Sequence, residues 1–470
     1  MKSTDVKKGK LSFKTLIGYG IGGLGEGISY NFFYAYFLFF LTNVVGIKPA
    51  IAGTISLIAV LWDGISDPLI GYLSDNSKNP KGRRRPYILG GSILLAFSVI
   101  LLFSDFNLPS NLKVVYFIII NILYWTALTM TVIPHTSLGS ELTDDFDERT
   151  NIRAYQTIFM NIGAAIAMSA TLVLVTFFGA KFETTAKAWT SVAVIYGIIL
   201  FLAYFASWAS TKGKEPARQT TAETNKNFFG EYKNILKNKP LKYILSVDFF
   251  VNMILGISVS IRVYLYTYNF GYSEAKISSF LFVYSIAIIL GVLLVKSIAN
   301  SIGKKNAMIA GIISYTTGFL VLFIFPSTQF IVILGLLFEA YGNCTFWTLL
   351  YSLAYDTSVV EEYKHGEGKE GIIVSLVGLT MKAGNAIGMW LAGTGLALIG
   401  FNAELASQSA TTLTGLKMMY TLIDAGALLI TLVIFVRYPL TKDKYDNLKE
   451  IVKLKSQNKP YSTDGLEKLI

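Results

Sequence analysis

The sequence predicts an all-α membrane protein in which twelve transmembrane helices form two six-helix bundles. Of its 470 residues, 53% are hydrophobic and only 15% are charged, and the mean hydropathy is +0.51. A soluble domain carries about 25% charged residues, so this chain has too few charges to cover its apolar surface in water. Lipid accepts outward-facing apolar side chains, and long apolar runs recur along the whole chain.

Each predicted helix is an apolar run near or above the roughly 20 residues that cross a bilayer. The predicted spans are 15–45, 49–74, 86–104, 113–141, 152–179, 187–208, 242–270, 274–300, 305–325, 328–358, 370–399 and 414–437. The longest polar stretch between spans, 210–241, separates helix six from helix seven. We therefore expect a bundle over 1–209, a central loop over 210–241, a bundle over 242–440 and a helical polar tail over 441–470.

The distribution of Lys and Arg predicts the orientation of these helices. With the N-terminus in the cytoplasm, 33 of the 41 basic residues fall in cytoplasmic segments, 6 in outer loops and 2 within helices. This bias follows the positive-inside rule and explains the net charge of +11 better than nucleic-acid binding does. We expect an inner-membrane protein with both termini in the cytoplasm, whose basic tail and central loop face anionic lipid.

Enzyme classes find little support. The single cysteine, Cys344, excludes an internal disulfide and a cysteine-based metal site, and there are only two histidines. No His-Glu-x-x-His, nucleophile elbow or phosphate-binding Gly-x-x-x-x-Gly-Lys occurs. We expect neither an enzyme nor a bound cofactor, and no filter-like loop indicates a channel.

Charged residues at membrane depth are the first candidates for function, because each costs about 2.5–3.5 kcal/mol on insertion scales. Asp63 and Asp67 are four residues apart on one helix and therefore share a face. Two such carboxylates repel each other, and a bound H⁺ or Na⁺ relieves the repulsion, with Ser66 as a further oxygen ligand. The alternative is that they pair with basic residues near the cytoplasmic face.

Three further charged residues inside predicted helices are candidates. Glu26, among closely spaced glycines, is either a ligand for a solute or cation or the counter-ion of a buried base. Lys382 lies near mid-depth and needs a carboxylate partner, for which Asp63 or Asp67 is our candidate. Arg262 lies near the outer end of its helix, and we expect it to snorkel to the surface.

Several separate motifs resemble one transporter family, the glycoside–pentoside–hexuronide:cation symporters of the melibiose-permease branch. The motifs follow one another along nearly the whole chain: WDGISDP (62–68), GYLSD (71–75), GRRRP (82–86), IP (133–134) with ELTD (141–144) and DERT (147–150), Asp356 with EEYK (361–364) and GKEG (368–371), and KAGNAIG (382–388). The two-bundle layout is that of the major facilitator fold.

The resemblance implies uptake of a sugar or glycoside together with Na⁺ or H⁺ by alternating access. It implies a cation site at Asp63 and Asp67, which serve as metal ligands if the cation is Na⁺. It also implies solute contacts at Lys382 and at Trp347, whose indole would stack on a sugar ring. Inner-gate roles would fall to the basic loop and to acidic and basic residues near the cytoplasmic ends: Arg83, Arg84, Arg85, Asp144, Arg149, Asp356 and Glu362.

The sequence departs from melibiose permease at the sugar clamp. The helix-one and helix-four aspartates of that protein are Gly27 and Val132 here, and the helix-one acid is displaced to Glu26. A helix-four tryptophan is Thr136, and a helix-five arginine is Gln156. We therefore expect a different glycoside, pentoside, hexuronide or related polar solute, held by Glu26, Gln156 and Thr136.

The absence of the helix-four carboxylate removes a possible Na⁺ ligand and therefore favours H⁺ over Na⁺ as the co-transported cation. We further expect a monomer in the lipid bilayer that transports without a tightly bound cofactor. The alternative function is transport or facilitated diffusion of a non-sugar organic solute without cation coupling.

Overall fold

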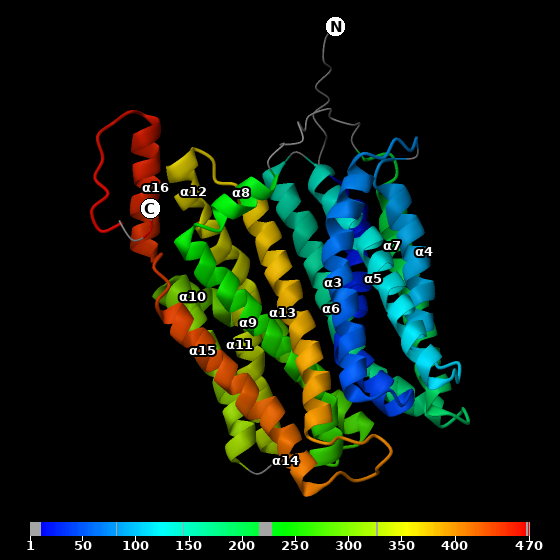
Figure 1. The fold of residues 1–470 in the computed structure, drawn as a ribbon. Helices are drawn as coiled ribbons and strands as arrows, with labels where there is room; N and C mark the ends of the chain where they lie inside the picture. The colour runs from blue at the N-terminus through cyan, green and yellow to red at the C-terminus, as the bar shows by residue number, and fades with distance from the viewer. Residues whose placement is uncertain are drawn as a thin grey trace. The chain divides into compact units, whose positions relative to one another are not determined.

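The structure is a computed structural model that describes residues 11–80, 82–143, 145–215, 228–325, 328–466 and 469. Helices account for nearly all of this part of the chain, and Figure 1 shows their order from the N-terminal helices to the C-terminal tail. The helices pack into two compact units. The N-terminal unit is built on α1–α7, and residues 271–282 and 396–407 group with it.

The N-terminal unit contains seven α-helices and one π-helical turn. They are α1 (Phe13–Gly20), α2 (Gly22–Phe39), η1 (Phe40–Val44), α3 (Pro49–Asp75), α4 (Arg85–Leu102), α5 (Ser110–Glu141), α6 (Phe146–Gly179) and α7 (Thr185–Ser210). Within this unit α2 packs most extensively on α6, α4 on α5 and α7, and α3 on α5. The candidate residues of the first half therefore lie on helices that share interfaces.

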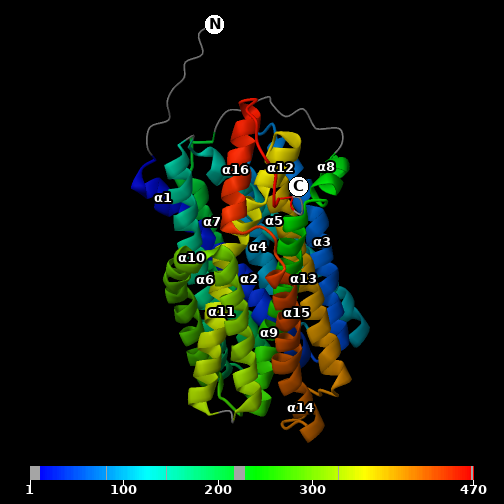
Figure 2. The ribbon, with the colours of Figure 1, turned by 90° about the vertical axis from the view of Figure 1, so that its left-hand side faces the viewer.

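The C-terminal unit contains the remaining elements, apart from residues 271–282 and 396–407. They are α8 (Phe228–Ile235), α9 (Lys239–Tyr264), η2 (Leu265–Asn269), α10 (Glu274–Ile324), α11 (Gln329–Asp356), α12 (Ser358–His365), α13 (Glu370–Leu398), α14 (Ala410–Met418), η3 (Met419–Ile423), α15 (Asp424–Val436) and α16 (Lys442–Ser456). The predicted tail helix is present as α16, which packs against α12 in Figure 2. Part of the predicted central loop is helical, as α8.

The spans agree with the twelve predicted from the sequence. Ten helices in the described part are long and apolar enough to cross a membrane. One of them, the 51-residue α10, consists of two helices joined at Gly303, whose φ of 82° only glycine adopts readily. The first predicted span is interrupted at Ile21, between α1 and α2. Counting α10 twice and joining α1 to α2 gives twelve.

The start of α6 differs from the prediction by six residues. The sequence placed Arg149 in a loop before a helix at 152, but the helix begins at Phe146. Asp145 caps it, because its Oδ1 accepts a hydrogen bond from the Glu148 N–H at 2.9 Å. Arg149 therefore lies in the first turns of the helix and not in a loop.

Glycines bring α2 and α6 into close contact. A Cβ on Gly27 would lie 2.0 Å from the Met160 carbonyl oxygen, and one on Gly163 would lie 2.3 Å from that of Leu24. In the C-terminal unit a Cβ on Gly291 would meet the Cys344 sulfur at 2.5 Å, and the Cys344 thiol is buried and lies 3.2 Å from the Tyr341 carbonyl oxygen. These positions have no room for a side chain.

Candidate solute and cation site

Asp63 and Asp67 lie side by side on α3 and share one hydrogen-bond donor from α5. The Thr129 hydroxyl oxygen is 2.8 Å from Asp63 Oδ1 and 3.1 Å from Asp67 Oδ1. Asp63 is 2% exposed, and Asp67 is half-buried. The predicted shared face is confirmed, and the hydroxyl that bridges the carboxylates was not predicted.

Ser66 completes a cluster of oxygen atoms around this pair. Its hydroxyl lies 3.2 Å from the Thr129 hydroxyl and donates to the Asp63 carbonyl oxygen at 3.2 Å. Thr129 carries a single hydroxyl proton, so it donates to one carboxylate at a time. The cluster is therefore rich in acceptors, which suits a proton or a small hard cation with oxygen ligands.

Protein carboxylates alone do not make a multidentate metal site here. Among the described residues, no group of three or more His, Cys, Asp or Glu side chains is arranged to hold a metal ion. A Na⁺ ion at this place would take further ligands from the hydroxyls of Ser66 and Thr129. The predicted assignment of Asp63 and Asp67 as Na⁺ ligands stays a prediction.

Glu26 connects to α6 through Gln156. The Gln156 amide donates to Glu26 Oε2 at 3.0 Å and accepts from Arg153 at 2.8 Å. Both interpretations of Glu26, as a ligand and as the counter-ion of a base, therefore have a structural basis. Its carboxylate accepts a hydrogen bond from the Gln156 amide, and the basic residue Arg153 contacts the same amide. Tyr30 lies within electrostatic range of Asp63, Glu26 and Asp67. Glu26 and the carboxylate pair therefore border the same part of the unit.

His135 belongs to the same network, although no partner for it was evident in the sequence. Its ring stacks on Tyr19 with centroids 4.3 Å apart, and its Nε2 lies 2.9 Å from the Ser207 hydroxyl. The Tyr19 hydroxyl donates to the His135 carbonyl and reaches Gln156 Oε1 at 3.5 Å. The His135 imidazole on α5 thus packs against Tyr19, and the Tyr19 hydroxyl contacts the Gln156 side chain that donates to Glu26.

The aromatic side chains on α2, α3 and α5 differ in their burial and contacts. Trp125 is fully buried, and Trp62 donates to the Thr126 hydroxyl at 2.8 Å. Tyr30 and Tyr34 are half-buried and stack with ring centroids 6.3 Å apart. Thr136 is half-buried on α5.

The C-terminal unit carries the other two solute candidates. Lys382 is half-buried on α13, and Trp347 on α11 is 37% exposed and packs edge-to-face on Phe346. The pairing of Lys382 with Asp63 or Asp67 stays a prediction, as does the stacking of Trp347 on a sugar.

Between α9 and α13, the helix that carries Lys382, the structure places a buried carboxylate that was not predicted from the sequence. Asp248 on α9 is fully buried, accepts from Asn252 at 2.8 Å and accepts from the Thr380 hydroxyl of α13. Asn385 donates to Asn252 Oδ1 at 2.9 Å and extends the network along α13. The signal was present, because Asp248 is a charged residue inside a predicted span.

The prediction that Arg262 snorkels to the outer surface is wrong. Arg262 is 2% exposed and pairs with the fully buried Glu339 at 2.8 Å. Its Nε donates to the Tyr420 hydroxyl at 2.8 Å, and its guanidinium lies 4.6 Å from the Tyr284 ring centroid. A buried counter-ion on α11 satisfies the charge inside the bundle, so it does not need to reach water.

The basic loop predicted to act in gating is held by acidic residues of its own unit. Arg83 pairs with Glu141 at 2.6 Å, and Arg84 pairs with Asp75 at 2.7 Å and with Glu141 at 2.9 Å. Glu215 accepts hydrogen bonds from the backbone N–H groups of Arg83 and Arg84. The loop between α3 and α4 is thus tied to the end of α5 and to the residues that follow α7.

Other predicted gating residues have varied surroundings. Arg85 stacks on Trp208, and Arg149 donates to the Thr143 carbonyl at 3.0 Å. Asp356 pairs with Lys304 at 2.6 Å, while Glu362 is exposed. Asp144 lies outside the described residues. Their gating role stays a prediction.

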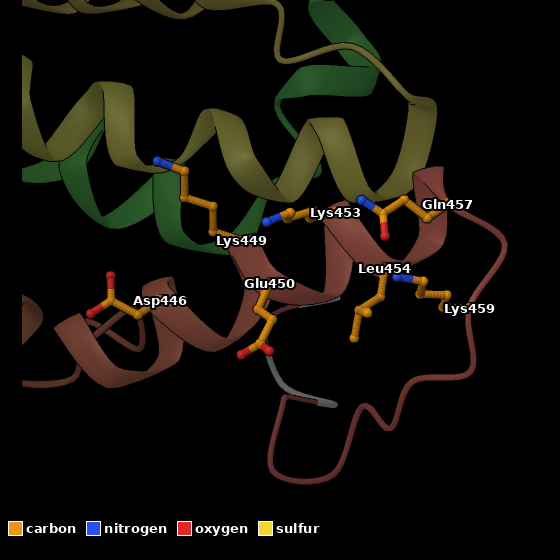
Figure 3. A pocket seen from close by; sticks show the side chains of 7 residues that line it. All are labelled: Asp446, Lys449, Glu450, Lys453, Leu454, Gln457 and Lys459. Carbon is orange, nitrogen blue, oxygen red and sulfur yellow. The ribbon is translucent and has the colours of Figure 1, made fainter.

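The pocket in Figure 3 lies at the tail and not among the site residues. It is lined by Asp446, Lys449, Glu450, Lys453, Leu454, Gln457 and Lys459, which belong to α16 and the residues after it. The mixed charges and the absence of any lining residue from a spanning helix separate it from the solute and cation candidates.

The chain is similar in sequence to several transport proteins over nearly its whole length. The chain is 27% identical over 457 residues to the uncharacterized symporter YjmB of Bacillus subtilis, covering 97% of this chain and 98% of that protein. It is 26% identical to the isoprimeverose transporter of Lactiplantibacillus pentosus, with 98% and 95% covered. It is 22% identical to the putative glycoside/cation symporter YagG of Escherichia coli, with 88% and 89% covered.

Solved structures support the fold. A mutant of the nucleoside transporter NupG matches with a TM-score of 0.68 at 15% identity, covering 90% of this chain and 99% of that one. A D-xylose-proton symporter matches with a TM-score of 0.63 at 16% identity, covering 89% and 97%. Residues 18–442 match the family described as MFS/sugar transport protein. The chain therefore belongs to the MFS/sugar transport protein family, as a multi-pass membrane transporter rather than an enzyme.

Proposed function

We propose that this protein imports a sugar or glycoside together with a cation, H⁺ or Na⁺, by alternating access. The observation that carries the proposal is the pair of carboxylates on α3, bridged by one hydroxyl of α5 and flanked by Ser66. Relatives named as an isoprimeverose transporter and a glycoside/cation symporter support the solute class and the coupling.

In this proposal the cation binds at Asp63, Asp67, Ser66 and Thr129. Its positive charge offsets the repulsion between the carboxylates and frees the Thr129 hydroxyl from bridging them. A membrane potential then supplies about 2.3 kcal/mol per charge for each 100 mV, which corresponds to roughly 50-fold accumulation of solute for each cation.

The solute residues of the N-terminal unit would be Glu26, Gln156 and Thr136, and those of the C-terminal unit would be Lys382 and Trp347. Glu26 and the Gln156 amide are hydrogen-bonded to each other at 3.0 Å, so each offers remaining capacity to hydroxyl groups of a sugar. Trp347 is partly exposed, as a stacking platform requires.

We assign the protein to the inner membrane as a monomer, with both termini in the cytoplasm. The support for this orientation is the 33-to-6 bias of Lys and Arg between the two sides. H⁺ is the favoured cation, because the cluster offers two carboxylates and two hydroxyls but no third acidic ligand among the described residues.

The test is uptake into proteoliposomes of a panel of glycosides, pentoses and hexuronides under imposed H⁺ or Na⁺ gradients. We expect one solute to accumulate with one gradient. Asp63→Asn and Asp67→Asn should each abolish accumulation, while solute exchange without a gradient survives. Asp105→Asn is the matched control, because Asp105 pairs with Lys113 near the α4–α5 connection and away from the cluster.

Two results would count against the proposal. Normal accumulation in both variants would remove the cation site from the carboxylate pair. Downhill movement of a non-sugar solute, unaffected by either gradient, would make the protein an uncoupled facilitator.

A further inference from the structure

The C-terminal unit contains a buried carboxyl group that the transport proposal does not use. Asp424 opens α15 and is 0% exposed. Neither of its carboxylate oxygens accepts a hydrogen bond from any described protein group. A carboxylate anion in such surroundings has neither bulk solvent nor a protein donor among the described residues, and that state costs several kcal/mol.

The charged neighbours of Asp424, Arg262 and Glu339, form an ion pair with each other. Glu339 accepts from Arg262 at 2.8 Å and from the Tyr420 hydroxyl at 3.0 Å. Tyr420 in turn accepts from Arg262 Nε at 2.8 Å. The remaining Arg262 nitrogen, Nη1, makes no hydrogen bond within the described structure, so Asp424 receives none from the guanidinium.

The charge balance of the cluster then depends on Asp424. Arg262 and Glu339 cancel one another, and both are at most 2% exposed. An ionised Asp424 would leave one uncompensated negative charge in the bundle interior, whereas a protonated Asp424 leaves the cluster neutral. The other titratable groups near Arg262 and Glu339 in the described part of the chain are four phenols, which are neutral near pH 7: Tyr266, Tyr284, Tyr315 and Tyr420.

The backbone at this place is also unusual. Asp424 directly follows the π-helical turn η3, and the helix that carries Arg262 runs into a second π-helical turn, η2. Such turns occur mostly as single insertions in α-helices and are frequent at functional sites. The two insertions lie on helices that pack against one another.

We propose that the cluster of Arg262, Glu339 and Asp424 is a proton-binding site in the C-terminal unit, with the proton held on the Asp424 carboxyl group. It is separate from the Asp63 and Asp67 pair, which belongs to the N-terminal unit. The ligand is H⁺ and not a metal cation, because the Arg262 guanidinium repels a second positive charge in the same cluster.

Infrared spectroscopy of the purified full-length protein near pH 7 tests this assignment. The measured signal is the carbonyl-stretching band of protonated carboxyl groups, which a carboxylate lacks and which shifts in D₂O. We expect Asp424→Asn to remove one carboxyl group from this band. Asp443→Asn, an exposed change on α16, is the matched control and should leave the band as in the wild type.

An unchanged band in Asp424→Asn overturns the proposal, since Asp424 would then be ionised. If that variant does not fold, Asp424→Leu serves in its place, because an apolar side chain of similar size suits a site whose native group is neutral and accepts no hydrogen bond. Loss of folding in both variants would also overturn it, since it would mean that the negative charge itself is required. The readout does not depend on transport, so failure here leaves the proposed symport standing.

Discussion

The single hydroxyl group of Thr129 lies within hydrogen-bonding distance of two carboxylates, those of Asp63 and Asp67. Replacing it with valine keeps the shape of the side chain but removes the bridging donor, leaving Asp63 and Asp67 to repel each other. We expect Thr129→Val to alter the apparent affinity for the coupling cation by about tenfold, roughly 1.4 kcal/mol. The measurement is the cation dependence of solute uptake in proteoliposomes.

Thr131→Val is the control for this change. Thr131 is buried on the same helix, but its hydroxyl donates only to the Ala127 carbonyl oxygen, one turn back on α5. The control should show wild-type cation dependence. Equal effects of the two changes would mean that any buried threonine of α5 matters, and the bridging role would have to be abandoned.

At this scale, sequence reasoning found the charged candidates but not their partners. Asp63, Asp67 and Glu26 stand out because acidic residues inside apolar runs are rare. Thr129 looks like every other threonine of its helix, and only the register between α3 and α5 reveals its contact. Asp248 and Asp424 also lie inside predicted spans, as Asp63 does, and only the structure showed that both are fully buried.

Helix contacts depend on residues that have no side chain. On α2, a Cβ at Gly27 would collide with the backbone of α6, whereas one at Gly90 on α4 meets no atom within 4 Å. We expect Gly27→Ala to lower the thermal midpoint of the purified protein by several degrees, equivalent to about 1–3 kcal/mol of overpacking. Gly90→Ala should leave it unchanged, and similar shifts in both would argue against tight α2–α6 packing.

The Arg262–Glu339 pair links α9 to α11 through the interior. Arg262→Leu leaves Glu339 buried without its cation, a change that costs about 3–5 kcal/mol. We expect a large fall in thermal stability, measured by the monodispersity of the heated protein in detergent. The double change Arg262→Leu with Glu339→Leu should recover much of the loss. A double variant less stable than the single one would show that the pair itself holds the helices.

The position of Arg262 shows why an element-level prediction failed. Its place near the end of a span is compatible with snorkelling, and in sequence its partner is 77 residues away on another helix. Helix existence, in contrast, depends only on local apolar length, so the spans were predictable. The start of α6 was missed because the Asp145 cap, and not hydropathy, determines it.

The orientation of the whole molecule is a prediction from its basic residues. In bacterial cells with a periplasm, a green fluorescent protein fused after Ile470 should fluoresce, because it folds in the cytoplasm. Alkaline phosphatase inserted at Asn402, in the loop between α13 and α14, should be active, because it needs the periplasm. The reverse pattern would invert the predicted topology.

The two-bundle layout itself was predictable from the sequence, since one long polar stretch divides two sets of six apolar runs. The matches to transporters of known structure agree with it. What the sequence could not supply is the solute, because the positions that depart from melibiose permease, Gly27 and Val132, serve packing in the structure. The absence of a side chain at Gly27 lets α2 and α6 pack closely, and Val132 is 8% exposed.

The buried state of Cys344 has a practical consequence for studying motion. A chain whose one thiol is enclosed against Gly291 has almost no background reaction with water-soluble maleimides or nitroxide labels. Two engineered surface cysteines, one in each unit, would carry spin labels without first removing native thiols. Electron-resonance distances between them, recorded with and without solute, would follow the transport cycle as a change in separation.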